Sequence, residues 1–288
     1  MQGADFADAI QRADPAYYLL NWLSAQLGGG VYLVNLICAA AFGWGLVALC
    51  RVLPQPWLAL AVATPYLITV VAMGYTRQGV AIGFAMLAMV AFTRGKVMQY
   101  FVWVAVAATF HKSAVLLLPI AALAAPRYKL LTASVTAAVT TVLYAVLLKD
   151  SVEALSKNYL EAGYESEGAL VRVMMNALPA LVVVLGYKRM KVSPSARNLW
   201  LVLAALSLMT LVVLAVSSSS TAVDRVALYM IPIQLVGFAS LPQILSEGKA
   251  SQLWTGAVIA YSFLVQFVWL GFAVHAFAWI PYQSWLFL

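Results

Sequence analysis

The sequence predicts an all-α, polytopic integral membrane protein: a helical bundle with about ten membrane segments, some short or broken. Hydrophobic residues make up 64% of the 288 residues and charged residues only 9%, and the mean hydropathy is +0.92. A soluble domain has about a quarter charged residues and uses them to cover its surface. The apolar residues also gather in runs whose lengths suit membrane helices.

Ten apolar runs, separated by short polar connections, account for the predicted segments. They cover residues 31–50, 56–74, 78–93, 98–110, 113–125, 130–148, 170–187, 198–216, 225–242 and 254–273. A bilayer core takes about 20 apolar residues as helix. The runs 98–110 and 113–125 are shorter, so we expect two short helices that meet at His111, or one broken helix, packed inside the protein.

The chain is predicted to form a single transmembrane domain over residues 1–288, with two polar regions on the outer side. Residues 1–30 contain an outer loop and then an interfacial helix, within "DPAYYLLNWLSAQLGGG", whose aromatic residues suit the membrane surface. A long outer loop covers about 149–169. Because the chain begins with a polar segment on the outer side, we expect that an N-terminal helix ahead of it is missing from this sequence.

The loop charges predict which side of the membrane each connection faces. If the first residues lie outside and the segments alternate, ten of the 17 Lys and Arg residues lie inside, whereas nine of the ten acidic residues lie outside. The basic bias sets the orientation by the positive-inside rule, and "YKRMKVSPSAR" at 187–197 is the most basic connection. The net charge of +7 therefore reflects topology, and no nucleic-acid partner is expected.

Four cations depart from this rule, because they lie at the outer ends of apolar segments. They are Arg77, Lys112, Arg172 and Arg225. Charges placed there are costly, which indicates a bound anion or an acidic partner. A lipid-linked diphosphate suits them, since Arg and Lys bind phosphate while the lipid tail stays in the bilayer. The alternatives are separate snorkelling or salt bridges. Gln78 adds a second polar group beside Arg77.

His111 and Asp224 are the candidate proton-transfer residues. Burial and the neighbouring Lys112 would both disfavour a protonated His111, leaving an imidazole that can accept a proton. The alternative is a turn histidine satisfied by the backbone. Neither a metal nor a cofactor is expected, because the two histidines are far apart and the sequence contains no CxxC, HExxH, GxGxxG or P-loop pattern.

Two spaced motifs resemble those of a known family. "TRQGVAIGF" and "TFHKSAVLLLP" resemble the signature of EpsG-like, Wzy-type polysaccharide polymerases. The matching residues are Arg77, Gln78, Ala81, Phe110, His111, Lys112, Ser113 and Ala114, followed more weakly by Arg172, Asn176, Asp224, Arg225 and Tyr229. Family members usually carry Gly-x-Asp-Tyr in the first outer loop, whereas here Asp5 is followed by Phe6.

The resemblance implies an enzyme, a membrane glycosyltransferase of the bacterial inner membrane. It would polymerise repeat units carried on undecaprenyl diphosphate, at the outer (periplasmic) face, for exopolysaccharide, capsule or O-antigen. The lipid bilayer and a chain-length regulator are the further partners to consider. An acceptor hydroxyl would attack the anomeric carbon, and the lipid diphosphate would leave.

This chemistry assigns roles to the candidate residues. Diphosphate binding would fall to Arg77, Gln78, Lys112, Arg172 and Arg225. His111 would be the base or a further diphosphate ligand, and Asp224 a second candidate base or the residue that orients Arg225. Glycan binding would fall to Asp5, Tyr159, Tyr164 and Tyr229.

Three other activities stay open at this point. A ligase would use the same lipid-linked donor. A transporter or flippase would carry polar groups at the membrane midplane, where Ser207, Thr210 and Gln234 are better explained by helix packing. A membrane sugar acyltransferase would accommodate His111, although the cluster of Arg residues suits it less.

Overall fold

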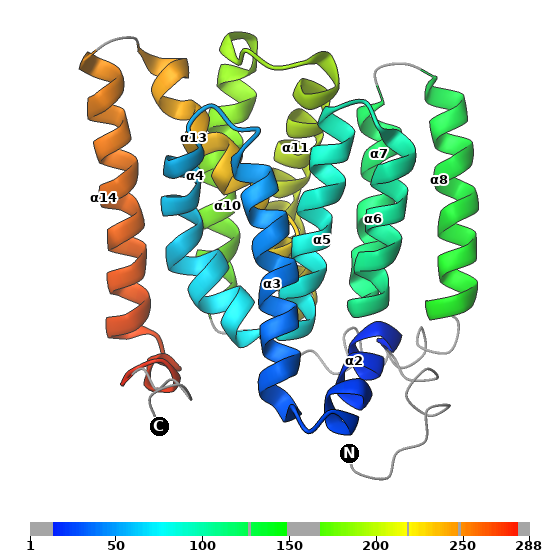
Figure 1. Ribbon diagram of the computed structural model, residues 1–288. Coiled ribbons are helices and arrows are strands. Elements are labelled where there is room, and N and C mark those ends of the chain that lie inside the picture. Colours follow the sequence, from blue (N-terminus) through cyan, green and yellow to red (C-terminus); the bar gives the residue numbers. More distant parts are fainter. Residues whose placement is uncertain (1–13, 126–127, 149–167, 218, 247–248, 282–288) are drawn as a thin grey trace.

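The computed structural model (Figure 1) describes residues 14–125, 128–148, 168–217, 219–246 and 249–281. All regular structure in these ranges is helical, which confirms the all-α prediction. Successive apolar segments run back and forth between the two ends of the bundle, so alternate connections lie at the same end (Figure 1).

The chain order of the helices is as follows. The first half contains α2 (Pro15–Gln26), α3 (Gly30–Cys50), α4 (Pro56–Ala63) with its π-helical continuation η1 (Thr64–Ala72), α5 (Thr76–Thr93), α6 (Val97–Phe110), η2 (Lys112–Leu117) and α7 (Leu118–Ala124). The second half contains α8 (Lys129–Leu143), η3 (Tyr144–Leu148), α10 (Ala169–Gly186), η6 (Tyr187–Arg189), α11 (Pro194–Val216), α12 (Ser220–Leu228), α13 (Pro232–Leu245), α14 (Lys249–Phe272) and η7 (Ala276–Ala278).

The predicted apolar runs coincide with helices, but the count of membrane spans differs. Six described helices are long and apolar enough to cross a membrane, or seven if α12 and α13 form one bent span. Three shorter apolar helices, Pro56–Ala72, Val97–Phe110 and Lys112–Ala124, complete the set. The expected count of about ten spans is therefore not confirmed. The run predicted as 225–242 is two helices bent by 55°.

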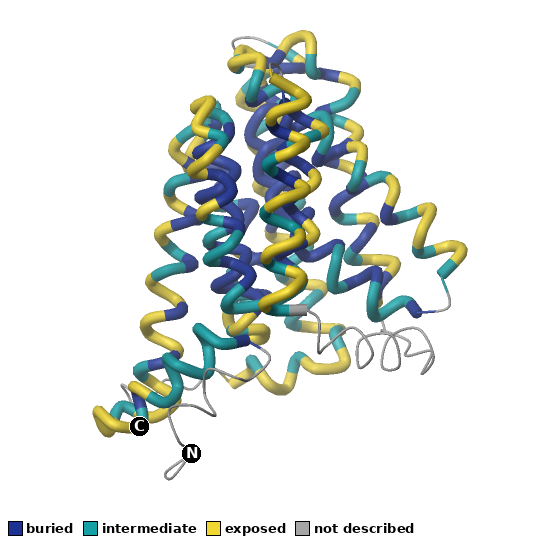
Figure 2. Tube along the Cα trace, turned by 90° about the vertical axis from the view of Figure 1, so that its right-hand side faces the viewer, coloured by how far each residue is buried: buried dark blue, intermediate teal, exposed yellow. Residues whose placement is uncertain are grey.

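Helix α5 lies at the centre of the bundle. Its apolar window is 83% buried, whereas those of α8 and α14 are only 11% buried. Figure 2 shows the same contrast, with buried residues gathered inside and exposed residues along the outer helices. The exposed side chains of α8 and α14 are mostly apolar and suit contact with lipid tails. Burial along α5 begins at Gln78, whereas Arg77 just before it is exposed.

Two glycines let α3 and α5 cross in direct backbone contact. A Cβ atom on Gly83 would lie 2.6 Å from the Cα of Phe42, and a Cβ on Gly45 would meet the backbone of Gly83. Small residues at crossing points allow membrane helices to approach closely and gain dispersion contacts. This crossing fixes α5 against α3.

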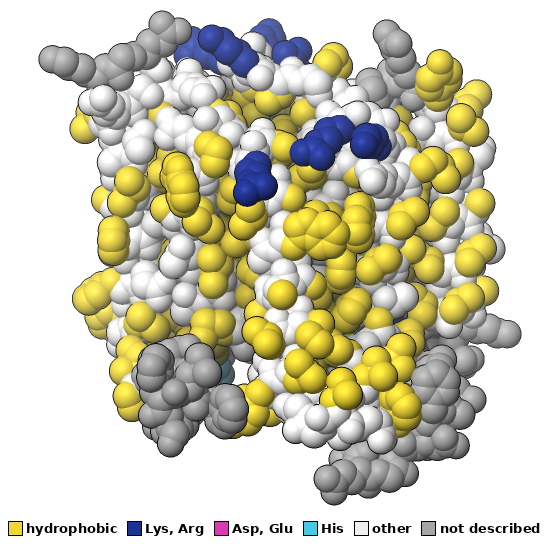
Figure 3. All heavy atoms as spheres, in the orientation of Figure 1, with side chains coloured by type: hydrophobic (Ala, Val, Ile, Leu, Met, Phe, Trp, Pro, Cys, Tyr) yellow, Lys and Arg dark blue, Asp and Glu magenta, His cyan; other side chains and the backbone are white. Residues whose placement is uncertain are grey.

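The two ends of the bundle carry different charges. At one end, which we call the basic end, lie nine described Lys and Arg residues and no described acidic residue: Arg51, Arg94, Lys96, Lys129, Lys188, Arg189, Lys191, Arg197 and Lys249. The opposite, mixed-charge end carries both described acidic residues, Asp14 and Asp224, with Arg77, Lys112, Arg172 and Arg225. On the face drawn in Figure 3, Lys and Arg side chains gather toward the basic end.

Candidate functional site

An ion pair between α2 and α5 forms one side of a polar cluster at the mixed-charge end. Arg77 Nη1 lies 2.9 Å from Asp14 Oδ2. Asp14 precedes the first residue of α2, whose Tyr17 and Leu20 pack on the small apolar cluster of Val34, Cys38 and Val80. The Asp14 side chain is 7% exposed and that of Arg77 49%, so the acid is fixed while the guanidinium still meets solvent.

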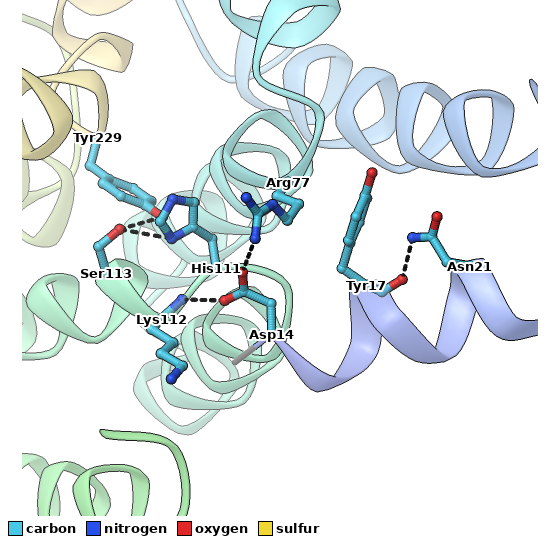
Figure 4. A network of polar contacts seen from close by, with 8 residues as sticks. All are labelled: Asp14, Tyr17, Asn21, Arg77, His111, Lys112, Ser113 and Tyr229. Atoms are coloured by element: carbon cyan, nitrogen blue, oxygen red, sulfur yellow. Dashed lines mark hydrogen bonds and ion pairs between the residues drawn. The ribbon is translucent and has the colours of Figure 1, made fainter. Parts of the chain in front are cut away.

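The same carboxylate also holds the break between α6 and η2. The backbone N–H of Lys112 donates to Asp14 Oδ1 over 3.3 Å. Lys112 is the first residue of η2, where a backbone N–H has no partner within its own helix. A carboxylate there also interacts favourably with the helix dipole. In Figure 4 the Lys112 side chain points away from Asp14, so that contact is made by the backbone.

His111 occupies the break itself, in an extended conformation with φ −155° and ψ 114°. Its Nδ1 lies 3.1 Å from Ser113 Oγ, and Ser113 Oγ lies 3.4 Å from the hydroxyl of Tyr229. Figure 4 shows these three side chains beside the Arg77–Asp14 pair. The sequence prediction that two short helices meet at His111 is confirmed, and the meeting point faces the polar cluster.

The surroundings of His111 favour its neutral form. Burial is the main cause, and the positive charges of Arg225 and Arg77 add to it, whereas Asp14 opposes it. Together they lower the pKa of His111 to about 4. A histidine with such a pKa is an uncharged proton acceptor at neutral pH.

The backbone of Arg225 lies close to the bend between α12 and α13 and is held by a hydrogen bond from another helix. The Gln78 amide Nε2 donates to the backbone carbonyl of Arg225 over 2.8 Å, and Asn176 Nδ2 donates to the carbonyl of Ala227 over 2.9 Å. These carbonyls lie in the last turn of α12, and the carbonyl of Ala227 also accepts from the backbone N–H of Met230 over 3.0 Å. Gln234 Nε2 in turn donates to Asn176 Oδ1 over 2.7 Å. Buried amides thus satisfy the backbone where this membrane segment bends.

A second ion pair joins α10 to α12. Arg172 Nε lies 2.7 Å from Asp224 Oδ1, and Arg172 Nη2 lies 2.8 Å from Asp224 Oδ2, which makes the pair bidentate. The side chains are 16% and 11% exposed. Asp224 was expected as a base or as the residue that orients Arg225; in the structure it forms an ion pair with Arg172. This arrangement ties α12 to α10, with Arg225 next in the chain.

The predicted site residues thus divide into three groups. Arg77, His111, Lys112 and Tyr229 form one cluster, and the charge of Arg225 acts on His111 within it. The second group, Gln78, Arg172 and Asp224, holds α12: Gln78 binds the backbone of Arg225, and Asp224 pairs with Arg172 of α10. Asp5, Tyr159 and Tyr164, with most of the predicted outer loop at 149–169, lie outside the described residues.

Two residues of the cluster were not anticipated from the sequence. Asp14 is the acid that meets Arg77, and the Tyr17 ring lies 5.8 Å from the Arg77 guanidinium carbon. A signal for Asp14 existed, because Asp followed by Pro is typical of a helix start. Its side chain makes no bond to its own helix, however. Within the described ranges no three His, Cys, Asp or Glu side chains gather as metal ligands would.

Neither the curated proteins nor the solved structures include a match to this chain. The family model that matches is described as the EpsG family, and the match covers residues 2–284, nearly the whole chain. The chain therefore belongs to the EpsG family, a family of Wzy-like polysaccharide polymerases.

Proposed function

We propose that the protein polymerises oligosaccharide repeat units carried on a membrane lipid diphosphate, undecaprenyl diphosphate. The observation that supports this most is an uncharged His111 at one end of a membrane bundle, where the charges of Arg225 and Arg77 lower its pKa and Lys112 follows it in the chain. Cations suit the diphosphate, and a neutral imidazole suits an acceptor hydroxyl. The family to which the chain belongs agrees with this chemistry.

The diphosphate would be bound mainly by Arg77, Lys112 and Arg225. Only one edge of the Arg77 guanidinium is engaged by Asp14, and its side chain is 49% exposed, so it retains donors for an anion. Arg225 has no side-chain ion pair among the described residues. As the glycosidic bond breaks, negative charge grows on the leaving diphosphate, and fixed cations stabilise that charge.

His111 would remove the proton from the acceptor. If Nδ1–H donates to Ser113 Oγ, and the Ser113 hydroxyl donates to Tyr229, the lone pair of Nε2 remains to accept a proton. The acceptor oxygen then forms a bond to the anomeric carbon, and the bond from that carbon to the diphosphate oxygen breaks. The electron pair leaves with the diphosphate, and the acceptor proton passes to Nε2.

Gln78, Arg172 and Asp224 are better explained as positioning residues. Gln78 is 2% exposed and donates to the backbone of Arg225, so it acts on the diphosphate through that residue. Arg172 binds both carboxylate oxygens of Asp224 through Nε and Nη2, which form one edge of its guanidinium. Glycan contacts by Asp5, Tyr159, Tyr164 and Tyr229, and binding of a chain-length regulator, remain predictions.

The cluster would face the outside of the bacterial inner membrane. The basic end holds nine of the 13 described Lys and Arg residues, and the positive-inside rule places such an end in the cytoplasm. A polymerase that faces outward would make secreted polysaccharide, capsule or O-antigen. Two midspan polar residues that a flippase would use, Ser207 and Thr210, instead donate to carbonyls of their own helix.

The direct test compares glycan products in a host that lacks its own copy of the gene. We expect His111→Gln and Arg77→Gln to give little polymer and to accumulate single lipid-linked repeat units. Arg94→Gln, at the basic end, serves as the control and should give full-length polymer. Normal polymer with both site variants would overturn the proposal. Accumulation of repeat units on the inner leaflet would indicate a flippase, and normal polymer lacking an acyl group would indicate an acyltransferase.

A further inference from the structure

A cavity of about 910 Å³ opens at the basic end, away from the candidate site. Its walls come from the connection between α10 and α11, from the end of α13 and from the start of α14. The lining residues are Lys188, Arg189, Met190, Lys191, Val192, Arg197, Gln243, Ser246 and Ser251. Helix α10 separates the two sites, with Arg172 in its first turn and Lys188 just beyond its end.

The cavity has the charge and the donors of an anion site. Four of its lining residues are basic, and both described acidic residues lie at the opposite end of the bundle. Four cations around one hollow repel each other unless an anion joins them. The first turn of α11 also lies there, since Arg197 is its fourth residue, and a helix N-terminus favours negative charge.

Two buried polar atoms in the cavity wall have no partner among the described residues. They are Arg197 Nε and Ser246 Oγ. A buried donor without a hydrogen bond is costly, so such atoms indicate a ligand that supplies acceptors. By contrast, Arg189 Nη1 already donates to the carbonyl of Ile244 over 2.8 Å and serves to join α10 to α13.

From these observations we propose that the cavity binds the phosphate group of an anionic ligand at the basic end of the bundle. A phosphate offers several acceptor oxygens to Arg197, Ser246 and the two lysines, Lys188 and Lys191. That chemistry is shared by the headgroup of an anionic phospholipid and by a soluble phosphate compound. Bound there, the phosphate would join the α10–α11 connection to α13 and α14 and stabilise this end of the bundle.

The test measures the thermal stability of the purified full chain in lipid nanodiscs. The first arm replaces part of the phosphatidylcholine with phosphatidylglycerol, and the second adds inorganic pyrophosphate to pure phosphatidylcholine discs. Every protein carries Arg77→Gln, so that anions at the candidate functional site contribute little. The test variant Lys188→Gln/Lys191→Gln changes two exposed side chains, which protects the fold. A second variant, Arg197→Gln, removes the buried donor.

The matched control is Arg94→Gln/Lys96→Gln, which removes two exposed charges from the same end but outside the cavity. Whichever of the two anions stabilises the protein, we expect Lys188→Gln/Lys191→Gln to bind it at least about tenfold more weakly. The control should change binding by less than about twofold. Stabilisation by phosphatidylglycerol alone identifies a lipid headgroup, and stabilisation by pyrophosphate identifies a soluble ligand. Equal responses in the lysine variant and the control, or no response in either arm, would overturn the proposal.

Discussion

The carboxylate of Asp14 lies 2.9 Å from the guanidinium of Arg77, although the two residues are 63 positions apart in the chain. Through this pair, α2 is fixed across the first turn of α5. Through its second oxygen, Asp14 also binds the backbone of Lys112, next to His111. One carboxylate therefore sets the position of a candidate diphosphate ligand and of the candidate base.

Substitutions of Asp14 should separate these two contacts. Asp14→Asn keeps an oxygen for the Lys112 N–H but removes the charge that holds Arg77, whereas Asp14→Ala removes both. Because misplacement of a site group by about 1 Å can cost about 100-fold in rate, we expect Asn to slow polymerisation about tenfold and Ala about 100-fold. Initial rates of polymer formation in reconstituted vesicles provide the measurement.

A double variant provides the control for this prediction. If Asp14 acts through Arg77, Asp14→Asn should add little to the loss already caused by Arg77→Gln, because coupled residues are not additive. Independent, multiplying effects would show that Asp14 acts on the reaction by another route. Protein amounts in the membrane must match throughout.

The helices were predictable from the sequence because a membrane helix needs a long apolar run. The run at 31–50 is α3, and the short runs beside His111 are α6 and η2–α7. The bend between α12 and α13 was not predicted, because it depends on distant side chains. The hydrogen bonds from Gln78 and Asn176 to carbonyls of α12 form only after the bundle has assembled.

The candidate site was predictable in its residue types and less so in its pairings. Spacing and charge indicated Arg77, His111 and Arg225. Which acid meets which cation depends on how the helices pack: Asp224 meets Arg172 across 52 positions, and Asp14 meets Arg77 across 63. Hydropathy contains no information about such contacts.

His111 predicts a distinctive pH dependence. Its pKa is lowered to about 4, mainly by burial, so the free protein should keep a neutral base down to about pH 4 to 5. A bound dianionic diphosphate favours the protonated form and raises this pKa. We therefore expect the acidic limb of kcat to lie at higher pH than that of kcat/KM. A kcat/KM limb near pH 6.5, or limbs in the reverse order, would contradict this assignment.

Removing a neighbouring charge should move the same limb. Arg225 and Arg77 both lower the pKa of His111, so Arg225→Gln should shift the acidic limb of kcat/KM to higher pH.

The lowered pKa of His111 should also make the stability of the protein depend on pH. Between pH 4 and 6.5 the unfolded chain binds more protons at His111 than the folded protein does. The free energy of unfolding should thus decrease as the pH falls through this window, by at most about 1.4 kcal/mol per unit. His111→Gln should remove that slope.

The Arg172–Asp224 pair should behave as a structural tie. Its side chains are 16% and 11% exposed, so Arg172→Met removes the bidentate guanidinium from a largely buried carboxylate and should lower stability by about 3–5 kcal/mol. Arg172→Lys loses the bidentate geometry and should recover only part of this. Thermal unfolding in detergent measures both effects.

The exchange Arg172→Asp with Asp224→Arg discriminates between a tie and a diphosphate ligand. If the pair only links α10 to α12, the exchanged protein should regain much of the lost stability, together with polymerase activity, because the opposite charges still meet. If Arg172 instead binds the diphosphate directly, the exchanged protein should fold and remain inactive. That result would return Arg172 to the group of diphosphate ligands.

The crossing of α3 and α5 supplies a matched pair of substitutions on one helix. A side chain at Gly45 would place its Cβ 2.6 Å from the carbonyl carbon of Gly83, whereas a Cβ at Gly43 meets nothing within 4 Å. Gly45→Leu must therefore push α3 from α5, and we expect a loss of about 3 kcal/mol or more in unfolding free energy. Gly43→Leu should change stability by less than about 1 kcal/mol. Because α5 carries Arg77, the displaced crossing should also weaken polymer formation, and equal stability of the two variants would show that the helices cross elsewhere.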